Sequence, residues 1–176
     1  TIKNQILKIN IKEKINKKEM YKKSIYLFLI IILYNCDSSN YKSFKNGWNS
    51  NENVKFTFIL NELIPHDVFI NVRNNSDYKF SNIFLIAKLK DSINLIYQDT
   101  LEYQMADANG FWLGKGFTNI KESKLWWKEQ WRPIHNGPFF IEIVQSMRNN
   151  GSINKVPNLD GIVDVGFSVF PNKNQK

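Results

Sequence analysis

Cysteine and histidine are both scarce in this sequence of 176 residues, which has Cys36 alone and the two histidines His66 and His135. A single cysteine excludes a disulfide within the chain. The histidines lie far apart and neither has a second histidine or a cysteine at the spacing of a zinc site. We therefore expect no metal, and we interpret both histidines as polar loop residues.

Patterns typical of catalysis are missing as well. There is no Gly-x-Ser-x-Gly nucleophile motif, and the Gly110–Gly116 run lacks the Lys-Ser/Thr ending and the helix of a phosphate loop. We interpret that run as a hairpin connection whose glycines let Phe111 and Trp112 fold inward. Glu122 and Glu129 could hydrolyse glycosides only if their carboxyl groups lay roughly 5–10 Å apart. We expect a protein that is not an enzyme and that needs no cofactor.

Positive charge is unevenly distributed along the chain. The net charge is +8, and residues 1–35 contain eight lysines against two glutamates, so this segment accounts for six of the eight charges. From Cys36 onward, the 16 basic and 14 acidic residues nearly balance. A nucleic-acid-binding protein keeps its positive charge on the folded surface. The distribution therefore argues against a nucleic acid as partner.

The N-terminal segment has the order of a secretory signal. A basic stretch at 20–24 precedes the uncharged apolar run Ile25–Leu33, and Cys36 follows three residues later. The run is well short of the roughly 20 apolar residues that a transmembrane helix needs. Leu33 and Cys36 stand at lipobox spacing, although Tyr34 and Asn35 are bulkier than the usual small residues. We predict a helical signal peptide and lipidation, including palmitate, at Cys36.

These features divide the sequence into five segments. Residues 1–19 are predicted to be an upstream or mis-started segment, 20–35 the lipoprotein signal peptide, and 36–47 a polar tether. Residues 48–170 form the folded domain, and 171–176 form a polar tail.

The folded domain has a hydrophobic period of two. Alternation of apolar and polar residues marks strands near 54–58, 68–72, 101–105, 139–147 and 163–169, while the apolar stretch 83–87 predicts a central strand covered on both faces. Clusters of Asn, Asp, Gly and Ser separate these runs and are typical of turns. The sequence therefore predicts an all-β fold, an antiparallel β-sandwich of about seven to eight strands.

Tryptophans are concentrated in one part of the chain. Trp112, Trp126, Trp127 and Trp131 fall within 20 residues of one another, with Arg132 beside the last. Neighbouring residues of a strand point to opposite faces, so Trp126 and Trp127 cannot both enter one core. We predict that at least one of the two is exposed near Trp131 or Arg132. These five residues form a candidate surface for a protein partner or a glycan, and the alternative is that most of the tryptophans only pack the core.

Two short segments match a pattern of O-glycosylation seen in exported proteins of Bacteroidota, Asp-Ser/Thr-aliphatic. They place candidate acceptor hydroxyls at Ser92 and Thr100.

Several blocks of the chain together resemble the gliding-motility lipoprotein family GldH of Bacteroidota. The most specific is DTLEYQMAD at 99–107, which continues through Gly110–Gly116 to Lys121–Trp126. The other blocks, in chain order, are Asn46–Trp48, Phe69–Asn74, Tyr78–Ile86, Gln145–Gly151 and Leu159–Phe167.

The resemblance implies an envelope lipoprotein that gliding requires and that is linked to type IX secretion, without a catalytic residue, cofactor or defined ligand. We expect it on the outer membrane, facing the periplasm, because the tether lacks the acidic run associated with surface export. One hypothesis is an interaction component that binds other gliding or secretion proteins. The alternative is a lipid-anchored glycan-binding module of the cell envelope.

Overall fold

The computed structural model describes residues 40–172, which form strands, turns and loops. The strands in chain order are β1 (Asn40–Ser43), β2 (Trp48–Asn49), β3 (Val54–Leu60), β4 (His66–Asn74), β5 (Asn82–Lys90), β6 (Leu95–Gln104), β7 (Lys121–Trp131), β8 (Gly137–Gln145), β9 (Asn158–Leu159) and β10 (Ile162–Pro171). No segment in this part of the chain is a helix able to cross a membrane. The predicted signal peptide and Cys36 lie outside the described residues.

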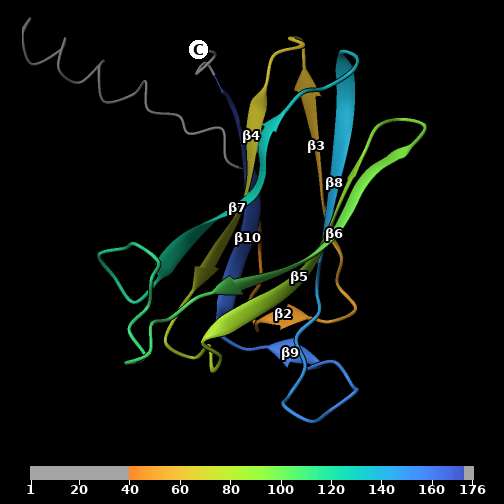
Figure 1. The fold of residues 1–176 in the computed structure, drawn as a ribbon. Helices are drawn as coiled ribbons and strands as arrows, with labels where there is room; N and C mark the ends of the chain where they lie inside the picture. The colour runs from red at the N-terminus through yellow and green to blue at the C-terminus, as the bar shows by residue number, and fades with distance from the viewer. Residues whose placement is uncertain (1–39, 173–176) are drawn as a thin grey trace, which may run out of the picture. The chain divides into compact units, whose positions relative to one another are not determined.

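The strands form two larger antiparallel sheets and one small one (Figure 1). The first sheet has the order β1-β10-β4-β7, and the second has the order β3-β8-β5-β6. The short strands β2 and β9 pair with each other. The predicted all-β class is confirmed, and the two larger sheets contain eight strands, in agreement with the expected seven to eight.

The core lies between the inner faces of the two sheets. Phe167 of the first sheet packs against Phe56 of the second, with ring centroids 5.0 Å apart, and Trp131 meets Phe139 edge-on at 5.2 Å. In β5 and β8 every second residue is buried, as the period of two requires. At one end Trp48 is fully buried, stacks on Phe44 and donates its indole N–H to the Glu52 carbonyl at 2.8 Å.

The folded domain begins earlier than the sequence predicts. Residues 40–43, assigned to the polar tether, form the edge strand β1 paired with β10, and Phe44 is buried. The segment is short and polar, so its strand character comes from pairing with residues more than 120 positions away. At the other end, Asn172 is still held, since its N–H donates to the Pro65 carbonyl at 2.8 Å.

Strand β5 differs from the prediction of a strand covered on both faces. Ile83, Leu85 and Ala87 are fully buried, whereas Phe84 and Ile86 on the opposite face are only half-buried. The strand is central within its sheet, between β8 and β6, but its outer face carries no further layer of strands in the described residues.

Candidate functional site

The outer face of the first sheet has a composition unlike that of a merely solubilising surface. Register places Arg73 of β4 between Asp164 of β10 and Glu122 of β7, in one row across the sheet. Two residues further along β4, Asn71 lies between Gly166 and Lys124. The next row pairs Ser168, Phe69 and Trp126. Charged, polar and aromatic side chains therefore stand in successive rows on one surface.

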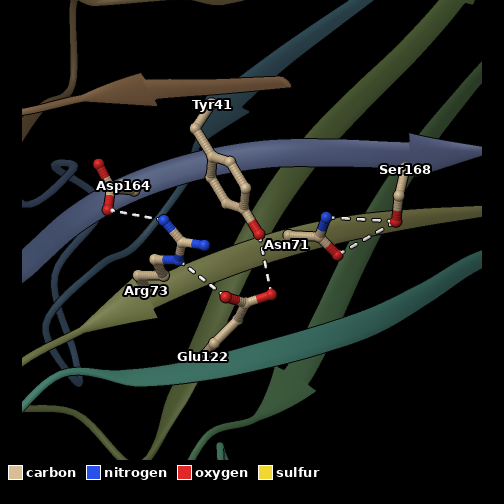
Figure 2. A network of polar contacts seen from close by, with 6 residues as sticks. All are labelled: Tyr41, Asn71, Arg73, Glu122, Asp164 and Ser168. Atoms are coloured by element: carbon tan, nitrogen blue, oxygen red, sulfur yellow. Dashed lines mark hydrogen bonds and ion pairs between the residues drawn. The ribbon is translucent and has the colours of Figure 1, made fainter. Parts of the chain in front are cut away.

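Arg73 is the centre of a polar network on this face (Figure 2). Its Nε donates to Glu122 Oε2 at 2.8 Å, and its Nη1 lies 3.6 Å from Asp164 Oδ2. The Tyr41 hydroxyl donates to Glu122 Oε1 at 2.8 Å, and the guanidinium stands 3.9 Å from the centre of the Tyr41 ring. Four strands thus contribute one side chain each to a single connected cluster.

The electrostatics of Arg73 follow from these contacts. Partial burial acts to lower the pKa of Arg73, but the Glu122 hydrogen bond, with Tyr41, Glu122 and Asp164 nearby, outweighs it and raises the pKa. The Arg73 and Glu122 side chains are still about one-third exposed, so solvent screening limits each pair to about 1 kcal/mol or less. The network therefore acts mainly to fix the orientation of these side chains.

Gly166 makes room for the Tyr41 ring. A Cβ at this position would lie 2.4 Å from the Asn40 carbonyl oxygen and 2.7 Å from the ring. Beside it, the buried Asn71 and Ser168 side chains bond each other, with Asn71 Nδ2 donating to Ser168 Oγ at 3.2 Å. The glycine therefore lets β1 and its tyrosine lie flat over the sheet.

Three aromatic rings continue the surface beyond the polar network. Trp126 meets Phe69 edge-on with centroids 4.5 Å apart, and Phe170 lies 6.0 Å from Phe69. The Lys124 Nζ stands 4.2 Å from the Phe69 centroid and 3.9 Å from that of Phe170. Trp126 is 47% exposed. A half-exposed indole held on a fixed aromatic base is the kind of anchor found at binding surfaces.

The predicted tryptophan surface does not exist as one patch. Trp126 is exposed, as expected for one of the adjacent pair, but Trp127 and Trp131 are buried in the core. Trp112 is half-buried against Tyr78, with centroids 6.1 Å apart. Arg132 is exposed beyond the end of β7 and donates to the Leu63 carbonyl at 3.1 Å. Bulges in β7 accompany the burial of Trp127 and Trp131 on the inner face.

The loop before β7 also differs from its prediction. Trp112 folds inward, but Phe111 is 72% exposed, so the two do not enter the core together. Gly114 and Gly116 have a different role, because a Cβ at either would lie within 3.0 Å of a backbone oxygen of Glu122 or Ile120. These glycines allow the loop to approach β7 closely.

The remaining candidate residues lie apart from this face. Glu122 and Glu129 are seven residues apart on one strand, roughly 20 Å, which is too far for a glycosidase pair.

His66 is a buried residue at the start of β4 rather than a loop residue, and its Nδ1 lies 2.7 Å from the Ile64 carbonyl oxygen. No cluster in the described residues has three potential metal ligands of the His, Cys, Asp or Glu type. Ser92 and Thr100 are exposed on the β5–β6 hairpin, and their modification stays a prediction.

His135 joins two turns through a contact that depends on pH. Its Nε2 lies 3.1 Å from Asp91 Oδ2, and its ring stacks on Phe139. The pKa of Asp91 is lowered to about 2 by the N–H groups of Asn94 and Ile93 and by His135. The hydrogen bond to Asp91, followed by one to the Asn136 backbone, raises the pKa of His135 above its ordinary 6.5. The pair is therefore doubly charged in mildly acidic solution.

The stabilisation from this pair should be greatest between about pH 4 and 6.5. The stabilisation that Asp91 contributes is fully present above its ordinary pKa of 3.8 and is lost as the pH falls through about 2. The stabilisation that His135 contributes is fully present below its ordinary pKa of 6.5 and is lost as the pH rises through the raised pKa. Thermal unfolding of the unmodified chain and of His135→Gln from pH 3 to 9 should show the largest difference in Tm inside that window. A difference that grows above pH 7 would contradict the assignment.

The fold and its outer face define an all-β domain that presents an organised aromatic and charged surface. A family model described as GldH lipoprotein matches residues 38–169, and the chain therefore belongs to the GldH lipoprotein family. Membership indicates a lipid-anchored protein of the cell envelope. The resemblance found in the sequence is confirmed.

Two relatives are similar to this chain over nearly their whole length. The gliding motility lipoprotein GldH homolog of Christiangramia forsetii is 40% identical over 154 residues, which are 85% of this chain and 95% of the relative. The gliding motility lipoprotein GldH of Flavobacterium johnsoniae is 39% identical over 150 residues, 82% of this chain and 93% of the relative. Among solved structures, the infectious bursal disease virus VP2 subviral particle aligns with 78% of this chain and 31% of its own, at 14% identity and a TM-score of 0.31, which supports no functional comparison.

Proposed function

We propose that this protein is an outer-membrane lipoprotein required for gliding motility and linked to type IX secretion, in which it binds other envelope proteins and catalyses no reaction. The observation that carries the proposal is the outer face of the first sheet, where Trp126 is half-exposed on a base of Phe69 and Phe170 beside Lys124. Interface hot spots are enriched in tryptophan and are surrounded by polar residues that exclude water. The Arg73 network supplies such residues on the same face.

The position of the predicted anchor supports a site close to the membrane. Four residue steps separate Cys36 from Asn40, the first residue of β1. Even a fully extended chain spans at most about 14 Å over four steps. Lipidation at Cys36 would therefore hold the β1 edge of the first sheet near the periplasmic surface of the outer membrane, where envelope partners are available.

A Trp126→Ala variant should lose partner binding while keeping its fold. Truncation of a hot-spot tryptophan costs about 2 kcal/mol or more, a loss of roughly 30-fold in affinity. The ring is half-exposed, so the domain should remain folded with a small decrease in Tm. The measurement is quantitative recovery of envelope proteins after cross-linking in intact cells, together with gliding on agar. Ile153→Ala is the matched control, because that side chain is 86% exposed in a distant loop.

A glycan-binding module is the second candidate, and the same exposed indole favours it because sugar rings stack on tryptophan. The two functions separate in one experiment. In the first outcome no protein partner is recovered, the lipoprotein is retained on peptidoglycan or surface polysaccharide, and Trp126→Ala abolishes that retention. This outcome would favour glycan binding and would contradict the protein-binding proposal. Unchanged protein recovery and unchanged gliding in Trp126→Ala would remove this face from both.

A further inference from the structure

Strand β7 is an edge of the first sheet, and part of its free side is open. Lys115 and Glu122 bond each other through both N–H···O=C pairs at 2.8 Å, so the main chain of Glu122 points away from β4. In an antiparallel ladder every second residue shares that direction, which places the N–H and C=O of Lys124 on the same free side. Further along, the Trp126 carbonyl accepts from the Tyr103 hydroxyl. Lys124 therefore presents unpaired main-chain groups between two occupied positions.

The loop before β7 leaves a groove at this point. It pairs with β7 at Lys115 and then turns away, because the Leu113 N–H donates to the Met105 carbonyl at 2.9 Å instead of continuing along β7. The resulting β7 groove has a volume of about 700 Å³. Its lining residues are Gln104, Leu113, Lys115, Gly116, Phe117, Glu122, Ser123, Lys124 and Leu125.

The lining of the β7 groove favours a particular chemistry. Leu113 is 54% exposed and Phe117 is fully exposed, so an apolar wall faces solvent. Ser123 is buried, and its Oγ has no hydrogen-bond partner in the described part of the chain. Lys115 and Lys124 line the groove, and the Lys124 Nζ lies over the Phe69 and Phe170 rings with no carboxylate partner among the described residues, whereas the Glu122 carboxylate is already engaged by Arg73 and Tyr41. The groove is therefore apolar and basic, with one unsatisfied hydroxyl in its wall.

We propose that the β7 groove binds an extended, acidic segment of a partner protein as an added strand on β7. The main chain of the segment pairs with the N–H and C=O of Lys124, which is how sheet edges recognise peptides. An apolar side chain packs against Leu113 and Phe117, and carboxylates lie near Lys115 and Lys124. This inference rests on the proposed partner-binding function and adds the binding mode and the chemistry of the partner.

Charge argues against a second copy of the chain as the occupant. Antiparallel pairing of two β7 strands about Lys124 would set Lys124 opposite Lys124, with Lys121 and Lys128 nearby on both strands. Like charges directly opposite each other destabilise a strand pair. An acidic segment removes that repulsion and is attracted by the same lysines.

Peptide binding to the full mature lipoprotein in detergent tests the proposal. The probe is an acetylated and amidated hexapeptide of alternating aspartate and valine, compared by calorimetry with the same peptide carrying lysine for aspartate. The acidic peptide should bind at least tenfold more tightly. A double variant with Lys115→Glu and Lys124→Glu should reverse the preference, whereas Lys45→Glu, an exposed lysine in another loop, should leave it unchanged.

A backbone variant separates strand addition from simple charge attraction. Lys124→Pro and Lys124→Ala both lose the Lys124 charge, but only Lys124→Pro also removes the free N–H. It does so without breaking a bond to β4, and proline is tolerated on sheet edges. Lys124→Pro should bind the acidic peptide at least tenfold more weakly than Lys124→Ala, with little change in Tm. Equal affinity in Lys124→Pro and Lys124→Ala, absence of binding to the parent chain, or β7–β7 dimers trapped by a Lys124→Cys disulfide would each overturn the proposal. Partner recovery that depends on Trp126 but not on the groove variants would overturn the groove alone and leave the proposed function standing.

Discussion

A Cys36→Ser variant is expected to incorporate no palmitate analogue, to leave the membrane fraction and to abolish gliding. Buried acyl chain contributes about 0.8 kcal/mol per methylene, so a multiply acylated cysteine anchors the protein stably on a bilayer. The sequence has no second cysteine to take the lipid. Among residues 40–172 there is also no helix that could replace the anchor. The loss should therefore be close to complete rather than graded.

Metabolic labelling and fractionation of cells carrying only the variant provide the measurement. Ser39→Ala is the matched control, since it changes a residue three positions after Cys36 and should keep normal labelling, membrane association and motility. Near-UV circular dichroism of the purified variant should match that of the parent, because the substitution precedes β1, the first described strand, in the sequence. Normal labelling of Cys36→Ser would overturn the assignment of the anchor.

Period-two patterning predicted most of the sandwich because it is a local signal. Strands β3, β4, β6, β8 and β10 each contain one of the alternating runs, and the inner positions are buried in β4 and β8 but only half-buried along most of β3 and β6. Strand β5 was predicted as a strand, but how many of its faces are covered depends on the layers around it. That property is set by the packing of sheets and not by the segment itself.

Local patterning does not predict the strand character of β1 and of much of β7. Strand β7 reads KESKLWWKEQW, in which charges interrupt the apolar positions and bulges shift the register. Its strand character depends on pairing with β4, and the burial of Trp127 and Trp131 depends on the second sheet beneath them. The short β1 has no apolar pattern, and pairing with β10 gives it order.

The candidate site could be predicted only in part. Trp126 was identified as one of two residues that cannot share a face, and its exposure is confirmed. The polar network was missed, because Tyr41, Arg73, Glu122 and Asp164 are brought together by register across four strands. A usable signal was present in β4, where Phe69, Asn71 and Arg73 occupy the outward positions between buried valines and Ile70. Outward residues of that kind are candidates for function rather than packing.

Gly161→Ala is expected to be the most destabilising glycine substitution in the described domain. Gly161 has φ +80°, and a Cβ there would lie 2.0 Å from the Tyr78 backbone nitrogen and 2.6 Å from the Asp77 carbonyl carbon. Its own carbonyl accepts from the Asn75 N–H at 2.8 Å, so the two turns are locked together. Neither backbone can move without breaking that contact. We expect the free energy of unfolding to decrease by about 3–5 kcal/mol, the range of severe single substitutions, and the Tm to decrease on the order of 10 °C.

Gly151→Ala separates the steric clash from backbone strain. Gly151 has φ +78°, nearly the same as Gly161, but nothing lies within 4 Å of the Cβ position. The free energy of unfolding of Gly151→Ala should decrease only by the cost of holding alanine in a left-handed conformation, about 1 kcal/mol. Urea unfolding of both variants beside the parent chain gives the two free energies directly. Equal losses would show that the Asn75–Tyr78 turn shifts to accept a methyl group, and the close packing of these turns would then not be a determinant of the fold.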